Sequence, residues 1–517
     1  MNPISRRDVL GAASGAAVSF CVPSITSAQK ALASGELAFS SATDLARLIQ
    51  RKELSSVELT RYYIERIERF DGALNAVVTR DFERALAAAR LSDASLARGN
   101  RLGLLHGVPM TIKEAFDVSG LPTTWGEPAQ RNNVAQNDAT VVERLKAAGA
   151  HFMGKTNVPL RLADWQSYND IYGTTNNPWD TARSPGGSSG GSAAALAAGL
   201  TGLEFGSDVG GSIRNPSHFC GVYGHKPTYG IVPTLGHNPA GVVAEPDLNV
   251  VGPMARTAED LQLALDVVAG ADRFRSSAWR LELPQPKART LRDLRVAIWP
   301  NENSFPTSRE ISDRVQEVGE ALARAGAVVS DRARPEISAR EMHDTYLSLL
   351  GSAALVNLPD DYYSVTKGWA AELDANDQWP LAVLTRARVL DHRSWSDYNE
   401  ARTSYRLRWG AFFDDWDVVI CPISATTAYE HDHRPKLERA LAVDGAQTSH
   451  YEHYFWVGVA TVAYLPSTAF PTGLSNAGLP IGLQIVGPEY GDRTTIEAAR
   501  LIAQELGGFQ APPGFRA

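Results

Sequence analysis

The chain has 517 residues, of which 44% are hydrophobic and 21% are charged, and its formal net charge at pH 7 is −8. These proportions are ordinary for a soluble globular protein. The acidic balance, without a basic stripe that could neutralise phosphates, argues against nucleic acid as a partner. Beyond the first thirty residues no apolar run is long enough to span a membrane, so we expect a mature protein without membrane contact.

The first 28 residues have the features of an export signal. Arg6 and Arg7 form a twin arginine, a weakly apolar stretch follows at residues 11–22, and cleavage fits after Ala28. We therefore expect a twin-arginine signal peptide at residues 1–28 and a mature domain at residues 29–517, periplasmic or secreted. The mature chain would keep two cysteines, Cys220 and Cys421, which are too few for a disulfide framework.

Helix and strand patterns alternate along the mature chain. Helical patterns occupy residues 42–50, 57–69, 85–98, 140–148 and 494–506, and the second has a capping box at residues 55–58. Strand patterns occupy residues 108–112, 150–153, 203–206 and 480–486. This alternation predicts an α/β fold, which we expect to be a single large α/β/α layered domain with a central mixed β-sheet covered by helices.

Two glycine–serine clusters stand close together, at residues 185–192 and 210–214, with an alanine-rich run between them. Glycine clusters cost conformational entropy, so they occur where the backbone must take a conformation or an approach that a side chain would block. Two such loops returning to one place can bring hydroxyls and free backbone N–H groups together. Acyl transfer needs that combination.

Residues 149–156 match the P-loop pattern, ending in Lys155 and Thr156. A phosphate-binding loop needs a strand before its first glycine and a helix after its Lys-Thr pair. Here a helix precedes Gly149 and a strand lies inside the motif, while Pro159 would break a following helix. The match therefore does not predict nucleotide binding.

Residues 186–190 satisfy the G-x-S-x-G pattern of a nucleophile elbow, which would make Ser188 the nucleophile. That elbow requires a strand running into the turn, whereas residues 176–183 have the composition of a loop. The Ser–His–Asp interpretation is weakened, although His218 and His225 stay candidate partners. Both histidines are explained more simply as structural.

Two other chemistries find little support. Residues 364–367 match the S-x-x-K motif of penicillin-recognising enzymes, but the companion motifs are in the wrong order or missing, so we expect a loop there. No paired cysteines or clustered histidines and carboxylates predict a metal site, and no cofactor is expected.

Lys113 directly follows the buried strand predicted at residues 108–112. A lysine there could simply be ion-paired or extend its amine toward solvent. Combined with the serine clusters it has another use, because burial can lower a lysine pKa from about 10.4 toward 7. A neutral lysine can then act as the base for a serine nucleophile.

Several segments together resemble the amidase signature family. The three core motifs correspond to residues 107–114, 185–195 and 206–214, and further family blocks to residues 221–228, 251–257 and 478–492. Residues 149–156, which match the P-loop pattern, also resemble a segment at the end of a strand in that family. The resemblance spans about residues 40–505 and implies a small-molecule amide substrate.

The resemblance implies a Ser–cis-Ser–Lys triad. In that family the nucleophile lies 24 residues after the bridging serine. Ser212 lies 24 residues after Ser188, so the resemblance assigns the bridging role to Ser188 rather than to Ser189. Ser212 would attack the amide carbonyl, and Ser188 would pass its proton to neutral Lys113. A cis peptide bond is expected before Ser188.

The resemblance also implies an oxyanion hole and supporting residues. Its donors would be the backbone N–H groups of the second cluster, those of Val209, Gly210, Gly211 and Ser212. Three further polar residues are expected to support the triad: Ser189, Asp208 and Arg214.

Two residues depart from the family pattern. Trp125 stands where a small residue is common, and Val209 stands where threonine is common. We therefore expect a narrowed or aromatic-lined pocket, with Trp125 and Tyr168 in its wall. Insertions and pocket walls are expected in residues 270–400, where the further aromatic candidates, for wall or core, are Tyr362, Tyr363, Trp369 and Trp379.

These observations predict an exported amidohydrolase that cleaves a small, partly aromatic or apolar carboxamide to an acid and an amine or ammonia. An esterase or carbamate hydrolase could use the same triad. The rival from another class is the glutamine-hydrolysing subunit of a tRNA-dependent amidotransferase, which would need cytosolic partners. A non-catalytic amide-binding protein and a homodimer also stay open.

Overall fold

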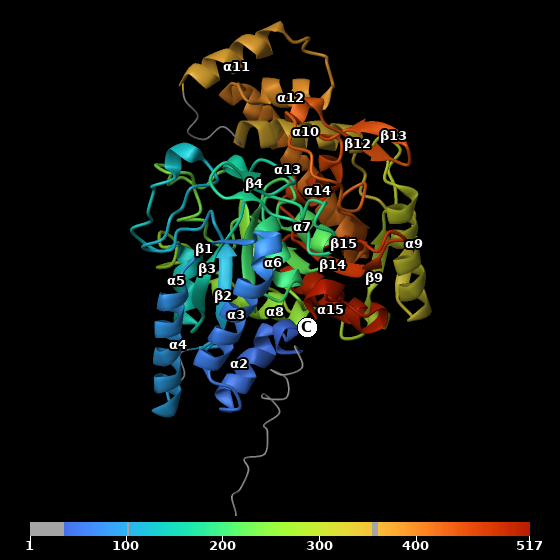
Figure 1. The fold of residues 1–517 in the computed structure, drawn as a ribbon. Helices are drawn as coiled ribbons and strands as arrows, with labels where there is room; N and C mark the ends of the chain where they lie inside the picture. Colours follow the sequence, from blue (N-terminus) through green and yellow to red (C-terminus); the bar gives the residue numbers. More distant parts are fainter. Residues whose placement is uncertain (1–35, 101–102, 354–359, 517) are drawn as a thin grey trace, which may run out of the picture.

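The computed structural model describes residues 36–100, 103–353 and 360–516 (Figure 1). The predicted signal peptide, residues 1–28, lies outside the described residues. Among the described helices, none combines the length and apolar character needed to cross a membrane.

The helices begin and end as follows: α2 (Ala42–Gln50), α3 (Ser56–Leu74), α4 (Phe82–Ala97), α5 (Thr140–Ala147), α6 (Gly190–Ala197), α7 (Arg214–Cys220), α8 (Ala258–Val268), α9 (Arg309–Arg324), α10 (Ala339–Ala353), α11 (Asp360–Glu372), α12 (Pro380–Ala387), α13 (His392–Asp415), α14 (Tyr454–Thr461) and α15 (Asp492–Leu506). The strands are β1 (Val77–Arg80), β2 (Pro109–Lys113), β3 (His151–Thr156), β4 (Tyr168–Asn169), β5 (Gly173–Thr174), β6 (Glu204–Asp208), β7 (Tyr223–Lys226), β8 (Val250–Ala255), β9 (Arg295–Ile298), β10 (Val328–Ser330), β11 (Val418–Pro422), β12 (Ala440–Val443), β13 (Ala446–Ser449), β14 (Ser467–Leu474) and β15 (Pro480–Val486).

A mixed sheet of eight strands forms the centre of the molecule, in the order β10-β9-β11-β15-β14-β7-β8-β6. Strands β10, β9 and β11 pair in parallel, and every pair from β11 to β6 is antiparallel. The predicted α/β fold with a central mixed sheet covered by helices is confirmed.

Strand β15 shows how the two faces of the sheet are covered. Ile481, Leu483 and Ile485 belong to the core cluster that includes residues of α8, α9 and α15. The residues between them face α7 and α14: Gln484 accepts a hydrogen bond from Arg214, and a Cβ on Gly482 would lie 2.8 Å from the Cα of His218. Glycine is required here because α7 lies directly on the strand.

A second sheet, in the order β1-β3-β2, lies beside the edge strand β6 of the large sheet. Strand β2 runs parallel to β3, and Thr111 on β2 donates to the Glu204 carboxylate on β6 at 2.6 Å. Lys113 is the last residue of β2, as predicted. The small sheet therefore brings the end of β2 to the edge of β6.

For several elements, the limits predicted from local sequence signals agree with the observed ones. Helix α2 and strand β15 have the predicted limits, and α3 begins with the predicted capping box between Ser55 and Glu58. The loop predicted at residues 364–367 is wrong, because these residues lie inside α11. Asp360 and Asp361 in its first turn favour a helix start, and the Ser364 hydroxyl donates to the carbonyl of Asp360 at 2.8 Å.

Helices α10 and α12–α14 form a second hydrophobic cluster with β11, and α11 lies at the outer end of this region (Figure 1). Trp409 and Trp456 are among its fully buried side chains. Helix α11 is largely exposed, with Thr366 as its buried residue. The insertion predicted over residues 270–400 is therefore only partly correct. Strands β9 and β10 belong to the central sheet and α9 packs in its core, whereas α10, α11 and α12 form part of a helical layer.

Candidate active site

The first serine cluster is a loop that continues into the first turn of α6. Its glycines allow close approach, since a Cβ on Gly187 would lie 2.4 Å from the carbonyl oxygen of Asp164, and one on Gly191 2.4 Å from the amide nitrogen of Asn157. A cis peptide bond joins Gly187 to Ser188, as the sequence predicted. The loop is therefore pressed against two neighbouring backbone segments.

The second cluster connects β6 to α7. The amide of Ser189 donates to the carbonyl of Ser212 at 3.2 Å, so the two clusters touch through their backbones. A Cβ on Gly206 would lie 2.7 Å from Ser189 Oγ, and one on Gly211, whose φ is +87°, would lie 2.6 Å from Val457 Cγ1. Glycine is needed at both positions for this approach and turn.

Lys113 connects the small sheet to the first serine cluster and to β6. Its Nζ donates to Ser188 Oγ at 2.7 Å, to Ser207 Oγ at 2.9 Å and to Ser189 Oγ at 3.0 Å. The lysine is 0% exposed and Ser188 is 1% exposed. Ser207 was not among the predicted site residues, although it lies within the core motif at residues 206–214.

The surroundings of Lys113 favour its neutral form. Burial lowers the pKa of Lys113 to about 7, although the charges of Asp208 and Glu204 oppose this. Glu204 is itself buried on β6, and burial raises the pKa of its carboxyl to about 7. A substantial fraction of Lys113 is therefore neutral near pH 7, and a neutral amine can accept a proton.

Ser212 is 8% exposed, and its hydroxyl has no hydrogen-bond partner among the described residues. Of the four predicted oxyanion donors, the N–H of Gly211 differs from the rest because it donates to Asp208 Oδ1 at 2.9 Å. The N–H groups of Val209, Gly210 and Ser212 have no acceptor within the described ranges. Three donors are thus available to an incoming oxygen.

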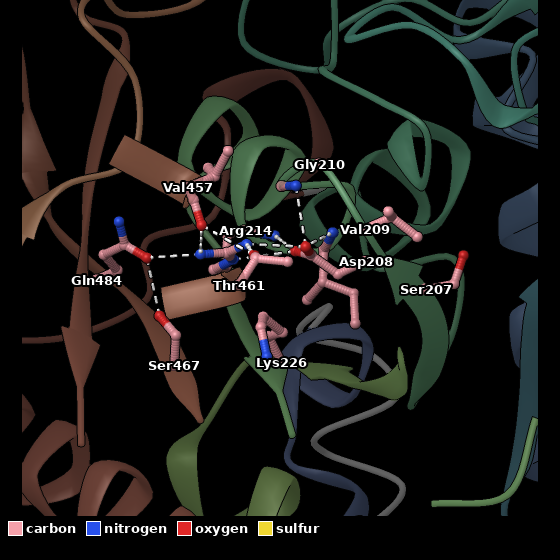
Figure 2. Close-up of polar contacts among 12 residues, drawn as sticks. Ser207, Asp208, Val209, Gly210, Arg214, Lys226, Val457, Thr461, Ser467 and Gln484 are labelled. Atoms are coloured by element: carbon pink, nitrogen blue, oxygen red, sulfur yellow. Dashed lines mark hydrogen bonds and ion pairs between the residues drawn. The ribbon is translucent and has the colours of Figure 1, made fainter. Parts of the chain in front are cut away.

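Asp208 and Arg214 form a fully buried ion pair beside this loop (Figure 2). Arg214 Nη2 lies 2.9 Å from Asp208 Oδ1, and its Nε lies 3.0 Å from Oδ2. Burial opposes ionisation of Asp208, but Arg214 and then Lys226 lower the pKa of its carboxyl to about 2. The guanidinium also donates to acceptors on α14 and β15, namely Val457 O, Thr461 Oγ1 and Gln484 Oε1.

This ion pair ties the second cluster to the centre of the sheet. Asp208 accepts hydrogen bonds from the backbone N–H groups of Gly211, Ile213 and Arg214, which shape the turn into α7. Because these bonds bind the turn to a carboxylate that Arg214 neutralises, the loop carrying Ser212 is held in one conformation. The predicted supporting roles of Asp208 and Arg214 thus have a structural basis.

Three aromatic side chains that sequence reasoning missed surround the Val209–Gly210 segment. The Tyr346 hydroxyl donates to the Val209 carbonyl at 2.9 Å, and Trp165 Nε1 donates to the Gly210 carbonyl at 2.7 Å. A Cβ on Gly210 would lie 3.0 Å from the ring of Tyr454. No local motif identifies these residues, since they come from α10, α14 and the loop before β4.

The two predicted pocket residues, Trp125 and Tyr168, have different aromatic partners. Trp125 is half-buried with φ of +56°, and its ring centroid lies 5.3 Å from that of buried His237. Tyr168 stacks on His433 with centroids 3.8 Å apart, and its hydroxyl accepts a hydrogen bond from Arg439 at 2.7 Å.

The four further aromatic candidates are on the surface. They are 41% to 58% exposed and lie on α11 or just before α12: Tyr362, Tyr363, Trp369 and Trp379. They are therefore not core residues.

The residues of the misleading motifs have other partners. Lys155 is buried at the end of β3, where its amine donates to the Pro122 carbonyl and to Thr123 Oγ1. His218 contacts the Thr426 carbonyl and accepts from the Gly482 amide, and burial lowers its pKa to about 4. Neither residue hydrogen-bonds a serine of the two clusters among the described contacts.

His225 is likewise held away from the serine clusters. Its Nδ1 lies 2.9 Å from Thr468 Oγ1, and its Nε2 lies 3.1 Å from Asp492 Oδ1, with both His225 and Asp492 fully buried. The expected structural role of this histidine fits these contacts.

Comparison with known proteins adds a family match. The family model described as Amidase matches residues 58–496. An indoleacetamide hydrolase of Bradyrhizobium diazoefficiens is 31% identical over 477 residues, which cover 90% of this chain and 86% of the relative. One subunit of the glutamyl-tRNA(Gln) amidotransferase of Anaeromyxobacter sp. (strain K) is 35% identical over 489 residues, covering 90% of this chain and 96% of the relative.

A solved structure shows the same architecture. The 6-aminohexanoate cyclic dimer hydrolase complexed with substrate superimposes with a TM-score of 0.74 at 26% sequence identity. The match covers 92% of this chain and 99% of the other chain.

Proposed function

The chain belongs to the amidase signature family, whose activity is amide hydrolysis, and on that premise we propose that it is a stand-alone amidohydrolase. In this proposal Ser212 is the nucleophile, Ser188 is the proton relay and Lys113 is the base. The observation that carries it is the 2.7 Å contact between Lys113 Nζ and Ser188 Oγ, two buried side chains.

Acylation begins with a neutral Lys113, which its lowered pKa supports. Ser212 Oγ attacks the amide carbonyl carbon while its proton passes to Ser188 Oγ, and the Ser188 proton passes to Lys113 Nζ. The carbonyl π electrons move to oxygen. In this proposal that charge is stabilised by the N–H groups of Val209, Gly210 and Ser212, which have no acceptor among the described residues.

Collapse of the tetrahedral intermediate needs a proton on the leaving nitrogen. Lys113, now an ammonium, returns its proton through Ser188 to that nitrogen, so the C–N bond breaks and a neutral amine or ammonia leaves. Water then attacks the Ser212 ester with the same relay acting as base. The products are the free acid and the regenerated Ser212 hydroxyl.

Aromatic surroundings support a small substrate with an aromatic or apolar part. Tyr346 and Tyr454 lie beside Gly210, and Val209 is half-buried at the same loop. We place Trp125 and Tyr168 in the wall of the substrate pocket. An indoleacetamide hydrolase among the relatives fits a substrate of this kind. Esters and carbamates present the same carbonyl to the triad.

The rival is a glutamine-hydrolysing amidotransferase subunit, which several relatives are named as. Such a subunit works in a complex. We propose instead an exported enzyme, with its signal peptide at residues 1–28 and its mature domain at residues 29–517. Its location would be periplasmic or secreted.

The export signal can be tested by itself. Replacing Arg6 and Arg7 together by lysine should keep the chain in the cytoplasmic fraction. Unchanged fractionation would contradict export.

The decisive experiment is a substrate screen of the purified protein, read by released amine, across primary amides, anilides, carbamates and aryl esters, with glutamine as the rival substrate. We expect amide hydrolysis without partners, lost in Ser212→Ala and in Lys113→Ala. Ammonia release from glutamine only in the presence of partner subunits would favour the amidotransferase. Unchanged amidase activity in both variants would overturn the mechanism.

A further inference from the structure

The loop that carries the free N–H groups has two adjacent glycines, Gly210 and Gly211. Glycine has no side chain to restrict its backbone, so a peptide plane between or before glycines rotates easily. An oxyanion hole works only when its donors already point at the developing charge. Something outside the loop must therefore hold these peptide planes.

Two buried side chains contact the carbonyl ends of these planes. Tyr346, on α10, is 0% exposed and donates its hydroxyl hydrogen to the Val209 carbonyl at 2.9 Å. Trp165, 1% exposed, donates its indole N–H to the Gly210 carbonyl at 2.7 Å. Both donors come from segments far from the loop in sequence, so the restraint is purely tertiary.

The two planes are held in different ways. In a trans peptide the C=O and the following N–H point in opposite directions. The Gly210–Gly211 plane is held at both ends, by Trp165 at its carbonyl and by Asp208 at its N–H, at 2.9 Å. Within the described parts of the chain, the Val209–Gly210 plane is held only at its carbonyl, by Tyr346, and the N–H of Gly210 at its other end has no acceptor.

We propose that Tyr346 and Trp165 are positioning residues for the oxyanion hole, and that Tyr346 sets the direction of the Gly210 N–H toward the reacting carbonyl. Neither side chain needs to touch the substrate. Each acts through the carbonyl that it binds. The inference rests on the proposed function, because it assigns to the Gly210 N–H a role in stabilising the tetrahedral intermediate.

Conservative variants test the proposal by removing only a donor. Tyr346→Phe keeps the ring and loses the hydroxyl, and Trp165→Phe keeps an aromatic side chain and loses the indole N–H. Removing one oxyanion donor outright costs on the order of 10²–10³ in rate. We expect Tyr346→Phe to lower kcat and kcat/KM together by about 10- to 100-fold, with KM unchanged. Trp165→Phe should cost about threefold, because Asp208 still holds that plane.

Two matched controls are available on α13, which packs against α10. Tyr405 is a buried tyrosine whose hydroxyl contacts Thr345 at 3.2 Å, and Trp409 is a buried tryptophan whose indole N–H has no partner among the described residues. Tyr405→Phe and Trp409→Phe remove the same atoms without touching the loop. We expect both to keep kcat/KM within about twofold of the parent.

The assays use indole-3-acetamide and 4-nitroacetanilide as substrates and phenylboronic acid as an inhibitor that forms an anionic adduct with a serine. Under the proposal, phenylboronic acid affinity falls in Tyr346→Phe by a factor similar to that in kcat/KM. Urea unfolding of each variant separates this effect from lost stability. Three results for Tyr346→Phe would overturn the inference. They are a parental kcat/KM, a loss of kcat/KM no larger than that of Tyr405→Phe, and a loss that comes from KM alone.

The variants distinguish a failure of the positioning role of Tyr346 from a failure of the proposed amidase mechanism. An inactive Ser212→Ala combined with parental Tyr346→Phe would overturn the positioning role and leave the amidase intact. Parental activity in Ser212→Ala would instead overturn the proposed mechanism, whatever Tyr346→Phe does.

Discussion

The amine of Lys113 lies 2.7 Å from the hydroxyl oxygen of Ser188, and both residues are buried. Lys113 reaches this contact from the end of β2, while Ser188 reaches it from the loop before α6. Because water does not solvate the amine, its charged form is disfavoured. Above about pH 7 the contact therefore joins a mostly neutral amine to a hydroxyl, which is the starting point of a proton relay.

The first prediction concerns pH. Burial lowers the pKa of Lys113 to about 7, so below pH 7 the amine is increasingly protonated and cannot accept a proton. We expect kcat/KM to rise with pH through about 7 and then level off. The profile should be measured from pH 5 to 9, within the range where the fold persists by circular dichroism. A profile that is flat through pH 7 would contradict the role of Lys113.

A second prediction distinguishes the neighbouring serines. Ser188 and Ser189 both accept a hydrogen bond from Lys113, at 2.7 and 3.0 Å, but only Ser188 is assigned to the relay. We expect Ser188→Ala to lower kcat/KM by about 10³-fold, in the range of lost acid–base catalysis, and Ser189→Ala to cost at least tenfold less. Steady-state kinetics on one amide decides this. Equal losses, or a larger loss in Ser189→Ala, would reassign the relay.

A third prediction concerns the ion pair of Asp208 and Arg214. Both side chains are 0% exposed, and removing one partner leaves a buried charge without compensation. Arg214→Met should lower the free energy of unfolding by about 3–5 kcal/mol. The control is Arg324→Ala, which breaks a contact with Glu320 whose side chains are 70% and 71% exposed and should change stability little. Urea titrations measure both, and equal effects would show that the buried pair is not special.

A fourth prediction separates this mechanism from a Ser–His–Asp hydrolase. His225 is buried against Asp492 and Thr468, with its nearest ring contacts at 3.1 and 2.9 Å, so it serves the packing of β7 against β14 and α15. We expect His225→Asn to lower the melting temperature while kcat/KM stays within about threefold of the parent. A loss of about 10⁴-fold in a folded variant would support a histidine base instead.

Local signals in the sequence predicted many of the elements. The limits of α2 follow from its apolar spacing, the start of α3 from the Ser55–Glu58 capping box, and the burial of β15 from its apolar run. A false motif could also be rejected locally, since the strand within residues 149–156 is present as β3. These predictions hold because helix caps and strand periodicity depend on residues close together in the chain.

Errors arose where local patterns were weak. Residues 364–367 were expected in a loop, yet they lie within α11, whose charged and aromatic sequence gives little periodic signal. Ser207 lay inside a recognised motif but its contact with Lys113 depends on how β6 meets the end of β2. The residue pattern along one strand does not specify which side chains of another strand its own side chains will contact.

The sequence by itself determined the composition of the site: Lys113 at a strand end, two glycine–serine clusters, and the 24-residue spacing that distinguishes Ser188 from its neighbour. The tertiary structure decided how these parts are arranged. It brought three serine hydroxyls to one amine and placed Tyr346 and Trp165 on the carbonyls of the loop. Short-range steric and hydrogen-bonding preferences are written in neighbouring residues, whereas these contacts join segments up to 137 positions apart and exist only once the sheet and its helices have packed together.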